Sequence, residues 1–90
     1  MGIADELITR GWTQRTEEDA AGRVCLRGAA SYACFGDSDH AWGLPAAVLD
    51  ALYWVCGDDN GVASWNDEQD RTFDEVLRAA KQADEILDAQ

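Results

Sequence analysis

The sequence predicts an all-α fold, a compact bundle of about four helices whose second and third helices are largely buried. The 90 residues are enough for one small domain spanning residues 1–90. Hydrophobic residues make up 47% of the chain and include four tryptophans, which is sufficient for one core. Apolar residues recur at helical spacing between glycine-marked breaks, and this periodicity favours helices over strands.

The first helix is predicted from Ile3 to Gly11. Ile3, Leu7 and Ile8 would line one side of it, and the glycine at position 11 would end it. The polar stretch Thr13–Gly22 then reads as a connection. Within it, Thr16–Asp19 is compatible with a short helical turn.

The second helix is predicted over Arg23–Phe35. Its polar residues, which include Arg27 and Ser31, form one narrow stripe, and the remaining residues are apolar and mostly small. A helix that is apolar almost all round is usually buried. Gly28 is unfavourable inside a helix, so we expect another helix backbone to pass close to it. A short strand over Arg23–Leu26 is the competing interpretation.

The third helix is predicted over Pro45–Val55, because proline suits the first turn of a helix. Its only charged residue is Asp50. We expect Leu52 and Tyr53 to face inward and Trp54 to lie in the core. A helix this apolar is also compatible with a homodimer.

The last helix has the clearest signals. Gly57–Gly61 is the strongest break in the chain, and Thr72 with Glu75 forms a capping box. The helix should run to about Ala89. Its apolar residues at 3.6-residue spacing are Phe73, Val76, Leu77, Ala80, Ala83 and Leu87.

Charge restricts the classes of partner. The net charge is -11 and the sequence pI is about 4.1. Residues 37–70 contain eight acidic residues and no lysine or arginine. This balance argues against direct binding of nucleic acid or of an anionic membrane. The acidic segment either keeps the protein soluble or attracts a basic partner.

The sequence favours a cytoplasmic protein. Its longest apolar stretch, Leu44–Gly57, is too short to span a bilayer, and no basic segment precedes an apolar run at Met1. Three cysteines among apolar neighbours indicate reduced thiols. We therefore expect no membrane association.

The loop between the second and third helices holds most of the candidate partner-binding residues. Trp42 stands there beside acidic residues and the only histidine, and an exposed indole flanked by acids is typical of a protein interface. The candidate partner-binding residues are Asp37, Asp39, His40, Trp42, Asp58 and Asp59.

Catalysis and resident cofactors are not expected. The chain has one histidine, no glycine-rich phosphate loop and no cysteine pair at metal-binding spacing. Residues 56–67 resemble a calcium loop in part, but Cys56 stands where a hard cation requires oxygen. An acidic turn is the better interpretation, and the cysteines read as core residues.

Several short motifs resemble a family of small proteins of unknown function from actinobacteria and their phages. The motifs are Gly11-Trp12, Cys25-Leu26-Arg27-Gly28-Ala29, Ser64-Trp65-Asn66-Asp67 and Arg71-Thr72. The loop Asp37–Trp42 does not match the family pattern. The resemblance implies a shared fold and no particular activity. We expect scaffold roles, with Trp65 closing the bundle end and Asn66 bonding to local backbone.

These observations favour a non-enzymatic acidic accessory protein, phage or actinobacterial, that binds a host or regulatory protein. An alternative is a DNA mimic that inhibits a nucleic-acid-binding protein. A third hypothesis is a small metal-binding protein. Affinity that falls steeply with salt would indicate mimicry, whereas an interface anchored by Trp42 would lose little.

Overall fold

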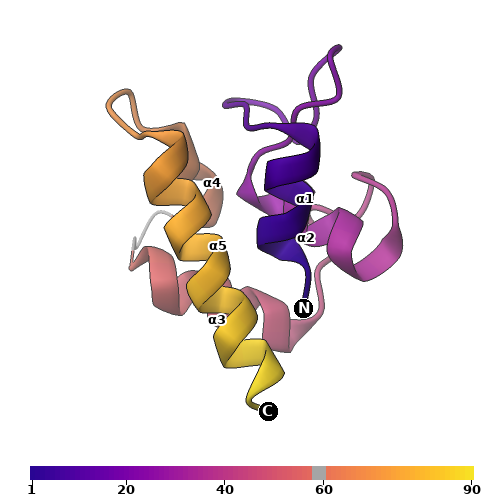
Figure 1. Ribbon diagram of the computed structural model, residues 1–90, viewed down its shortest axis with the longest axis vertical. Coiled ribbons are helices and arrows are strands. Elements are labelled where there is room, and N and C mark those ends of the chain that lie inside the picture. Colours follow the sequence, from indigo (N-terminus) through magenta and orange to yellow (C-terminus); the bar gives the residue numbers. More distant parts are fainter. Residues whose placement is uncertain (58–60) are drawn as a thin grey trace.

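The protein is all-helical. The computed structural model describes residues 1–57 and 61–90, and no strand is formed within these ranges. Its elements are α1 (Ile3–Arg10), α2 (Leu26–Phe35), α3 (Ala46–Cys56), α4 (Val62–Asp67) and α5 (Phe73–Asp88) (Figure 1). The predicted fold class is confirmed, with one short helix more than the four expected.

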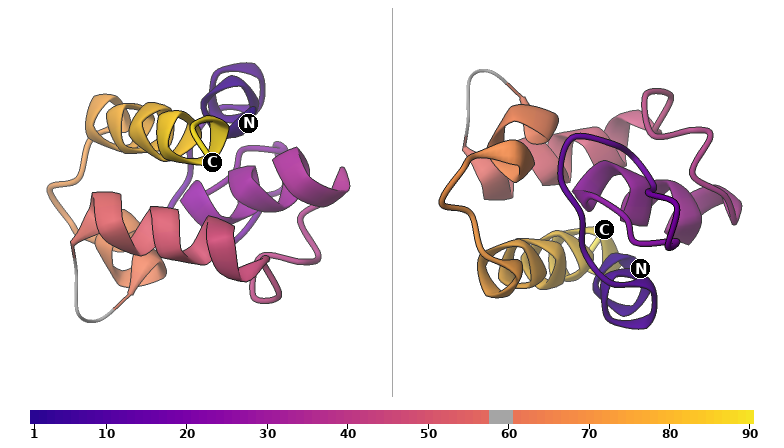
Figure 2. Two further views of the ribbon diagram at one scale, coloured as in Figure 1. Left: turned by 90° about the horizontal axis from the view of Figure 1, so that it is seen from below. Right: turned by 90° about the horizontal axis from the view of Figure 1, so that it is seen from above.

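The helices pack in two layers. α1 lies beside α5, and these two cover α2 and α3, as the end-on views of Figure 2 show. α4 contacts α2 and α3 near one end of the bundle. The buried core between the layers consists of Ile3, Ala4, Leu7, Val24, Leu26, Ala29, Ala30, Leu44, Val48, Ala51, Leu52, Val62, Val76, Ala80 and Ala83.

Three helix boundaries follow their predicted signals. α1 ends before Gly11, and α3 begins directly after Pro45. The capping box of α5 is formed, because the Thr72 hydroxyl accepts from the Glu75 amide at 3.3 Å and the Glu75 carboxylate accepts from the Thr72 amide at 3.0 Å. Local side-chain chemistry therefore decides where this helix starts.

α2 begins three residues later than predicted. Cys25 is its N-cap, and Val24 forms single bridges with Trp12 and Glu18. The competing strand interpretation was thus closer for Val24, although the pairing is confined to isolated bridges. The reason is a contact between distant segments: the Val24 carbonyl accepts from the Thr13 amide at 3.0 Å, and the Gly28 amide, its partner in a helix, donates to the Cys25 sulfur instead.

α4 was not predicted as a helix. It has only six residues and no side-chain cap at Gly61. Such a short segment is not stable alone, so its helical form depends on packing through the buried side chains of Val62 and Asn66. The helical form of this segment therefore depends on tertiary contacts that its local sequence does not reveal.

The outer side of α3 corrects another prediction. Leu52 is buried as expected, together with Val48 and Ala51, but Trp54 is 81% exposed and Tyr53 is 44% exposed. At about 100° per residue, Trp54 lies roughly 110° from the centre of the buried stripe, too far round to reach the core. The prediction that these two aromatics face inward was wrong, and so was the same expectation for Ile8, which is 58% exposed.

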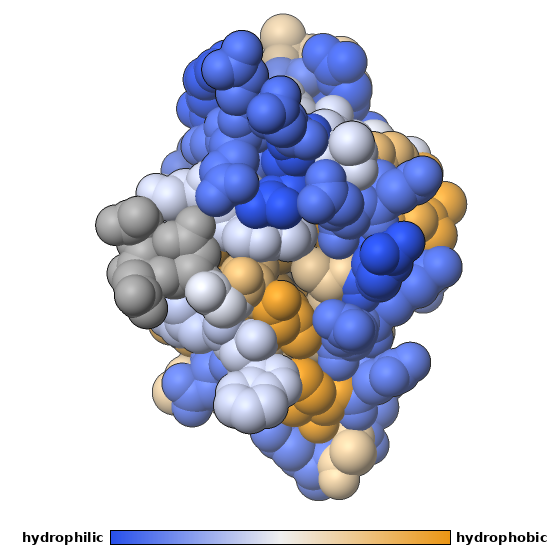
Figure 3. Space-filling model, turned by 90° about the vertical axis from the view of Figure 1, so that its left-hand side faces the viewer, coloured by the Kyte–Doolittle hydropathy of each residue, from blue (hydrophilic) through white to orange (hydrophobic). Residues whose placement is uncertain are grey.

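The face that carries α3 and α5 shows a strip of apolar surface bordered by hydrophilic residues (Figure 3). In residues 1–57 and 61–90, no helix is both long enough and apolar enough to cross a membrane.

Candidate functional site

The loop after α2 is ordered by its own polar side chains. Gly36 takes a left-handed conformation with φ 81°, which ends the helix and starts the loop. The Asp37 carboxylate accepts from the Asp39 amide at 3.0 Å and pairs with Nδ1 of His40 at 2.8 Å. The buried hydroxyl of Ser31 donates to the Asp37 carbonyl and accepts from the His40 amide. The loop therefore has a defined shape.

Arg27 lies beneath this loop and supports Trp42. Its side chain is buried, and a guanidinium N–H donates to the Ala41 carbonyl at 2.7 Å. The guanidinium also lies 4.2 Å from the ring centroid of Trp42, a cation–π contact. One face of the indole is thus covered by protein, yet Trp42 remains 67% exposed. The predicted exposure of Trp42 is confirmed.

Two glutamates of the connection between α1 and α2 complete the site. The indole N–H of Trp42 donates to the Glu17 carboxylate, and this bond is the main cause that lowers the pKa of Glu17. Glu18 accepts from the hydroxyls of Tyr32 at 2.7 Å and Ser38 at 2.8 Å, which lowers the pKa of Glu18. Both carboxylates are therefore held in the charged form beside the indole.

Gly28, which has no side chain, allows the connection between α1 and α2 to pack closely against α2. A Cβ added to Gly28 would stand 2.1 Å from the backbone carbonyl oxygen of Glu17. The same carbonyl accepts from the Cys25 amide at 3.2 Å. We expected a close approach at Gly28, but from another helix. The backbone that approaches it belongs instead to the connection that carries the two glutamates.

These elements form a surface that we call the Trp42 face, defined as Glu17, Glu18, Ser38, Asp39 and Trp42. The five side chains line an open cleft of about 280 Å³. Of the predicted site residues, Asp39 and Trp42 belong to this cleft, whereas Asp37 and His40 pair with each other and shape the loop. Asp58 and Asp59 lie outside the residues that the structure describes.

Nothing in the described part of the chain forms a cluster of three or more histidine, cysteine or acidic side chains arranged to hold a metal ion. Cys25 is buried, its sulfur accepts from the Gly28 amide at 3.4 Å, and burial raises the pKa of the thiol. A raised pKa disfavours the thiolate that a nucleophile requires. Cys25 therefore acts here as a helix cap.

The motif residues form a separate polar cluster around Asn66, which is fully buried. Its Oδ1 accepts from the indole N–H of Trp12 at 2.9 Å and from the Leu26 amide at 3.1 Å. Its Nδ2 donates to the Thr13 carbonyl at 3.2 Å and to Asp67 at 2.9 Å. We expected Asn66 to bond to local backbone, but most of its partners are more than 39 residues away in the chain.

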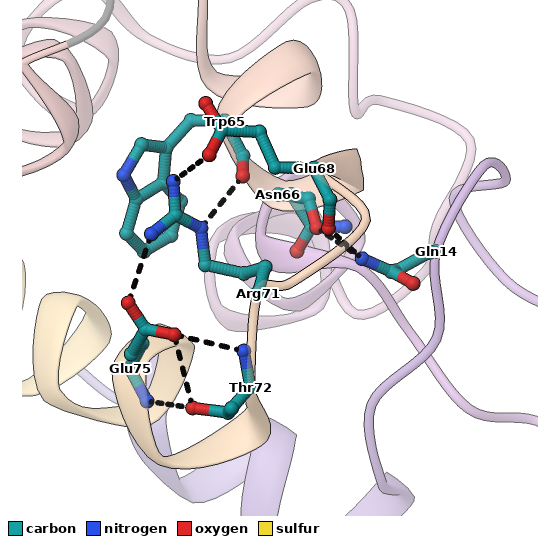
Figure 4. A network of polar contacts seen from close by, with 7 residues as sticks. All are labelled: Gln14, Trp65, Asn66, Glu68, Arg71, Thr72 and Glu75. Atoms are coloured by element: carbon teal, nitrogen blue, oxygen red, sulfur yellow. Dashed lines mark hydrogen bonds and ion pairs between the residues drawn. The ribbon is translucent and has the colours of Figure 1, made fainter.

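Arg71 joins α4 to the start of α5 (Figure 4). Its guanidinium stacks 4.0 Å from the ring centroid of Trp65 and donates to the Trp65 carbonyl at 2.9 Å. It also pairs with Glu68 at 2.9 Å and with Glu75 at 3.0 Å. Gln14 reaches the same turn and donates to the carbonyls of Asn66 and Glu68. The turn between the helices is thereby fixed from both sides.

Comparison with protein families identifies one match. The model of a family of unknown function, DUF6197, matches residues 2–85. The chain belongs to DUF6197. This agrees with the predicted membership in a family of unknown function. Neither the comparison with curated proteins nor that with solved structures finds a match.

In this DUF6197 chain three residues of the quoted motifs hold separate segments of the fold together. Trp12, Asn66 and Arg71 connect helices to one another, and none of them lines the Trp42 face. Sequence reasoning missed Glu17 and Glu18, because nothing in a polar connection reveals which helix it packs against. A charged residue on an otherwise apolar helix was the one available signal for Arg27.

Proposed function

We propose that this chain is a non-enzymatic acidic accessory protein of phage or actinobacterial origin that acts in the cytoplasm by binding a basic site on a host or regulatory protein. The single observation that supports this is Trp42, which is 67% exposed although it is held in a fixed position beside two carboxylates. Exposed tryptophans that can become fully desolvated are the residues that most often dominate binding energy.

The fixed position of Trp42 favours binding. Arg27 covers one face of the indole, and the Glu17 carboxylate accepts from its N–H. The Trp42 side chain is therefore already restricted to one rotamer, and it loses little conformational entropy when a partner binds. Immobilising a flexible side chain in an interface costs about 0.5–1.5 kcal/mol, and a preorganised one avoids most of that cost. The loop itself is braced by Asp37 and Ser31, which adds to the preorganisation.

The charges of the cleft select the chemistry of the partner. Glu17, Glu18 and Asp39 line it, and no basic side chain is among the described residues that do so. A lysine or arginine side chain fits such a cleft, because its charged end meets the carboxylates while its aliphatic part packs on the indole. We therefore propose that the partner presents a basic residue next to an apolar contact for Trp42.

Affinity capture from an actinobacterial lysate tests this function. Wild type is compared with Trp42→Ala, with Asp39→Asn and with Ile8→Ala, which removes an exposed apolar residue from α1 and serves as the matched control. Each capture is made at about 50 and 300 mM salt, between which the Debye length falls more than twofold. Circular dichroism melts establish that every variant is folded.

A partner retained by wild type and Ile8→Ala at both salts, and lost by Trp42→Ala, supports the proposal. A nucleic-acid-binding protein released at 300 mM and indifferent to Trp42→Ala would instead favour the alternative of DNA mimicry. The proposal is wrong if no captured protein depends on Trp42.

A further inference from the structure

A groove runs along the surface between α3 and α5, on the side of the molecule shown in Figure 3. One part of it, about 310 Å³, is lined by Trp54, Val55, Gln82, Glu85 and Ile86. The adjoining part, about 180 Å³, is lined by Val55, Trp65, Glu75, Arg78, Ala79 and Gln82. Val55 and Gln82 line both parts, so the two depressions adjoin along the surface between the helices. Together we call them the α3–α5 groove.

The rim of the groove carries an exposed aromatic side chain. Trp54, on its rim, is 81% exposed, and its indole makes no hydrogen bond or ring contact to the rest of the described chain. Contiguous apolar patches on monomeric proteins commonly mark interaction sites. α3 and α5 pack closely and hold this rim in place.

We propose that the α3–α5 groove is a second docking surface, which binds an amphipathic helix of a partner protein that carries lysine or arginine beside its apolar face. A groove between two helices, with Trp54, Val55 and Ile86 along one part of it, suits a helix that inserts side chains at i, i+3 or i+4, and i+7. α3 has 11 residues and is therefore about 16 Å long, which matches roughly three turns of a bound helix.

The charges lining the groove indicate where the bound helix would carry charges of its own. Beside Trp54 the charged lining residue is Glu85, which forms no ion pair within the described chain. At the other end Glu75 is paired with Arg71, whereas Arg78 forms no ion pair with any residue of 1–57 or 61–90. The bound helix would therefore place basic residues near Trp54 and an acidic residue near Arg78.

Charge also argues against a second copy of this chain as the occupant. Each copy carries a net charge of -11, and the exposed charge on α3 itself is Asp50. Self-association through α3 would bring like charges together, whereas a basic helix is attracted by the field of the whole protein. Complementary charge thus selects a basic partner segment over a homodimer.

This inference is independent of the Trp42 face. The loop that follows α2 lies on the right of Figure 1, whereas α3 and α5 form the left side of the molecule. The two surfaces have no lining residue in common. Variants at Trp42 and at Trp54 therefore separate the failure of one proposal from the failure of the other.

A displayed library of helical peptides tests the groove without a known partner. Peptides of about 16 residues, randomised with acidic and basic residues at equal frequency, are selected on wild type and counter-selected on Trp54→Ala. Trp54 is so exposed that its replacement should leave the fold intact, which circular dichroism verifies. Enriched peptides are then synthesised, and their affinities are measured for wild type, Trp54→Ala, Glu85→Lys, Trp42→Ala and the control Ile8→Ala.

We expect enriched peptides with an apolar stripe at helical spacing and net positive charge. Trp54→Ala should weaken their binding roughly tenfold or more, as loss of a central aromatic contact does. Glu85→Lys should also weaken it, while Trp42→Ala and Ile8→Ala should bind as wild type does. Amide shifts in nuclear magnetic resonance spectra should be confined to α3, α4 and α5.

Three results would overturn the inference. One is enrichment of no peptide that discriminates wild type from Trp54→Ala. Another is enrichment of acidic or non-helical sequences. The third is a dimer in light scattering that Trp54→Ala dissociates, because it would show that a second copy covers the groove.

Discussion

Removal of the Asn66 side chain should destabilise the fold more than any surface change. Asn66 is fully buried, and its Oδ1 accepts from the Trp12 indole and from the Leu26 amide. Asn66→Ala leaves both donors without their acceptor. A buried polar group left unsatisfied costs about 1–3 kcal/mol, so the two together should lower the free energy of unfolding by about 2–6 kcal/mol.

That loss is large for a chain of this size. At about 0.05–0.15 kcal/mol per residue, 90 residues give a total stability of roughly 5–14 kcal/mol. Asn66→Ala should therefore remove a substantial fraction of it. Asn66→Asp keeps the acceptor but places a carboxylate against Asp67, which now accepts from Nδ2. It should be destabilising at neutral pH and should recover part of its stability when the introduced carboxyl is protonated.

Urea unfolding followed by circular dichroism at 222 nm measures these losses, with linear extrapolation at a common m-value. Gln82→Ala is the control, because Gln82 is exposed on α5 and its replacement should change stability by less than about 0.5 kcal/mol. A double-mutant cycle with Trp12→Phe then isolates the bond to the indole. A loss below about 1 kcal/mol for Asn66→Ala would refute the reasoning.

Three other changes are expected to act at single contacts. Gly28→Ala should lower the melting temperature markedly, at a cost of about 1–3 kcal/mol or more, because the added Cβ meets the Glu17 carbonyl at 2.1 Å; an unchanged melt would contradict this. Asp84→Ala should cost about 0.5–2 kcal/mol and speed amide exchange at the start of α1, since the carboxylate accepts from the first two helical amides at 3.0 Å. The pKa of Glu18 is lowered by its bond from Tyr32, so this contact stabilises the fold above the ordinary value of 4.5 and is lost as the pH falls through the lowered pKa. Glu18→Gln should flatten that acid-side decline in urea midpoints, and a decline as steep as in wild type would show that Glu18 is not its cause.

The features that could be predicted from the sequence are those that local chemistry determines. The start of α5 depends on two side chains three residues apart, Thr72 and Glu75, and Pro45 defines the start of α3. The fold class follows from helical periodicity over longer segments. The membership in a family of unknown function rested on short motifs spread along the chain, and the family match over residues 2–85 agrees with it.

The features that could not be predicted depend on contacts distant in sequence. α4 is helical because Asn66 bonds to residues 40 and more positions away, and nothing within Val62–Asp67 states this. The position of Glu17 depends on a carbonyl that packs on Gly28. The exposure of Trp54 is a different case, because its angular position round α3 follows from helical periodicity and was available in the sequence. The exposure of Trp42 was predictable because it stands in a polar loop.

Both exposed tryptophans have enough unburied surface to contribute strongly to binding, so area does not distinguish their roles. A tryptophan can bury about 150–250 Å², and with 67% of Trp42 and 81% of Trp54 exposed, each retains about 2.5–5 kcal/mol of unrealised burial at 25 cal/mol per Å². Rigidity does distinguish them. Trp42 is fixed by Arg27 and Glu17, which suits recognition of a single geometry. The indole of Trp54 has no such partner within the described chain, so its rotamer can adjust to a helix bound in the adjoining groove. A chain with both surfaces can hold one partner rigidly through the Trp42 face while a flexible basic segment, of the same or another protein, occupies the groove on the opposite side.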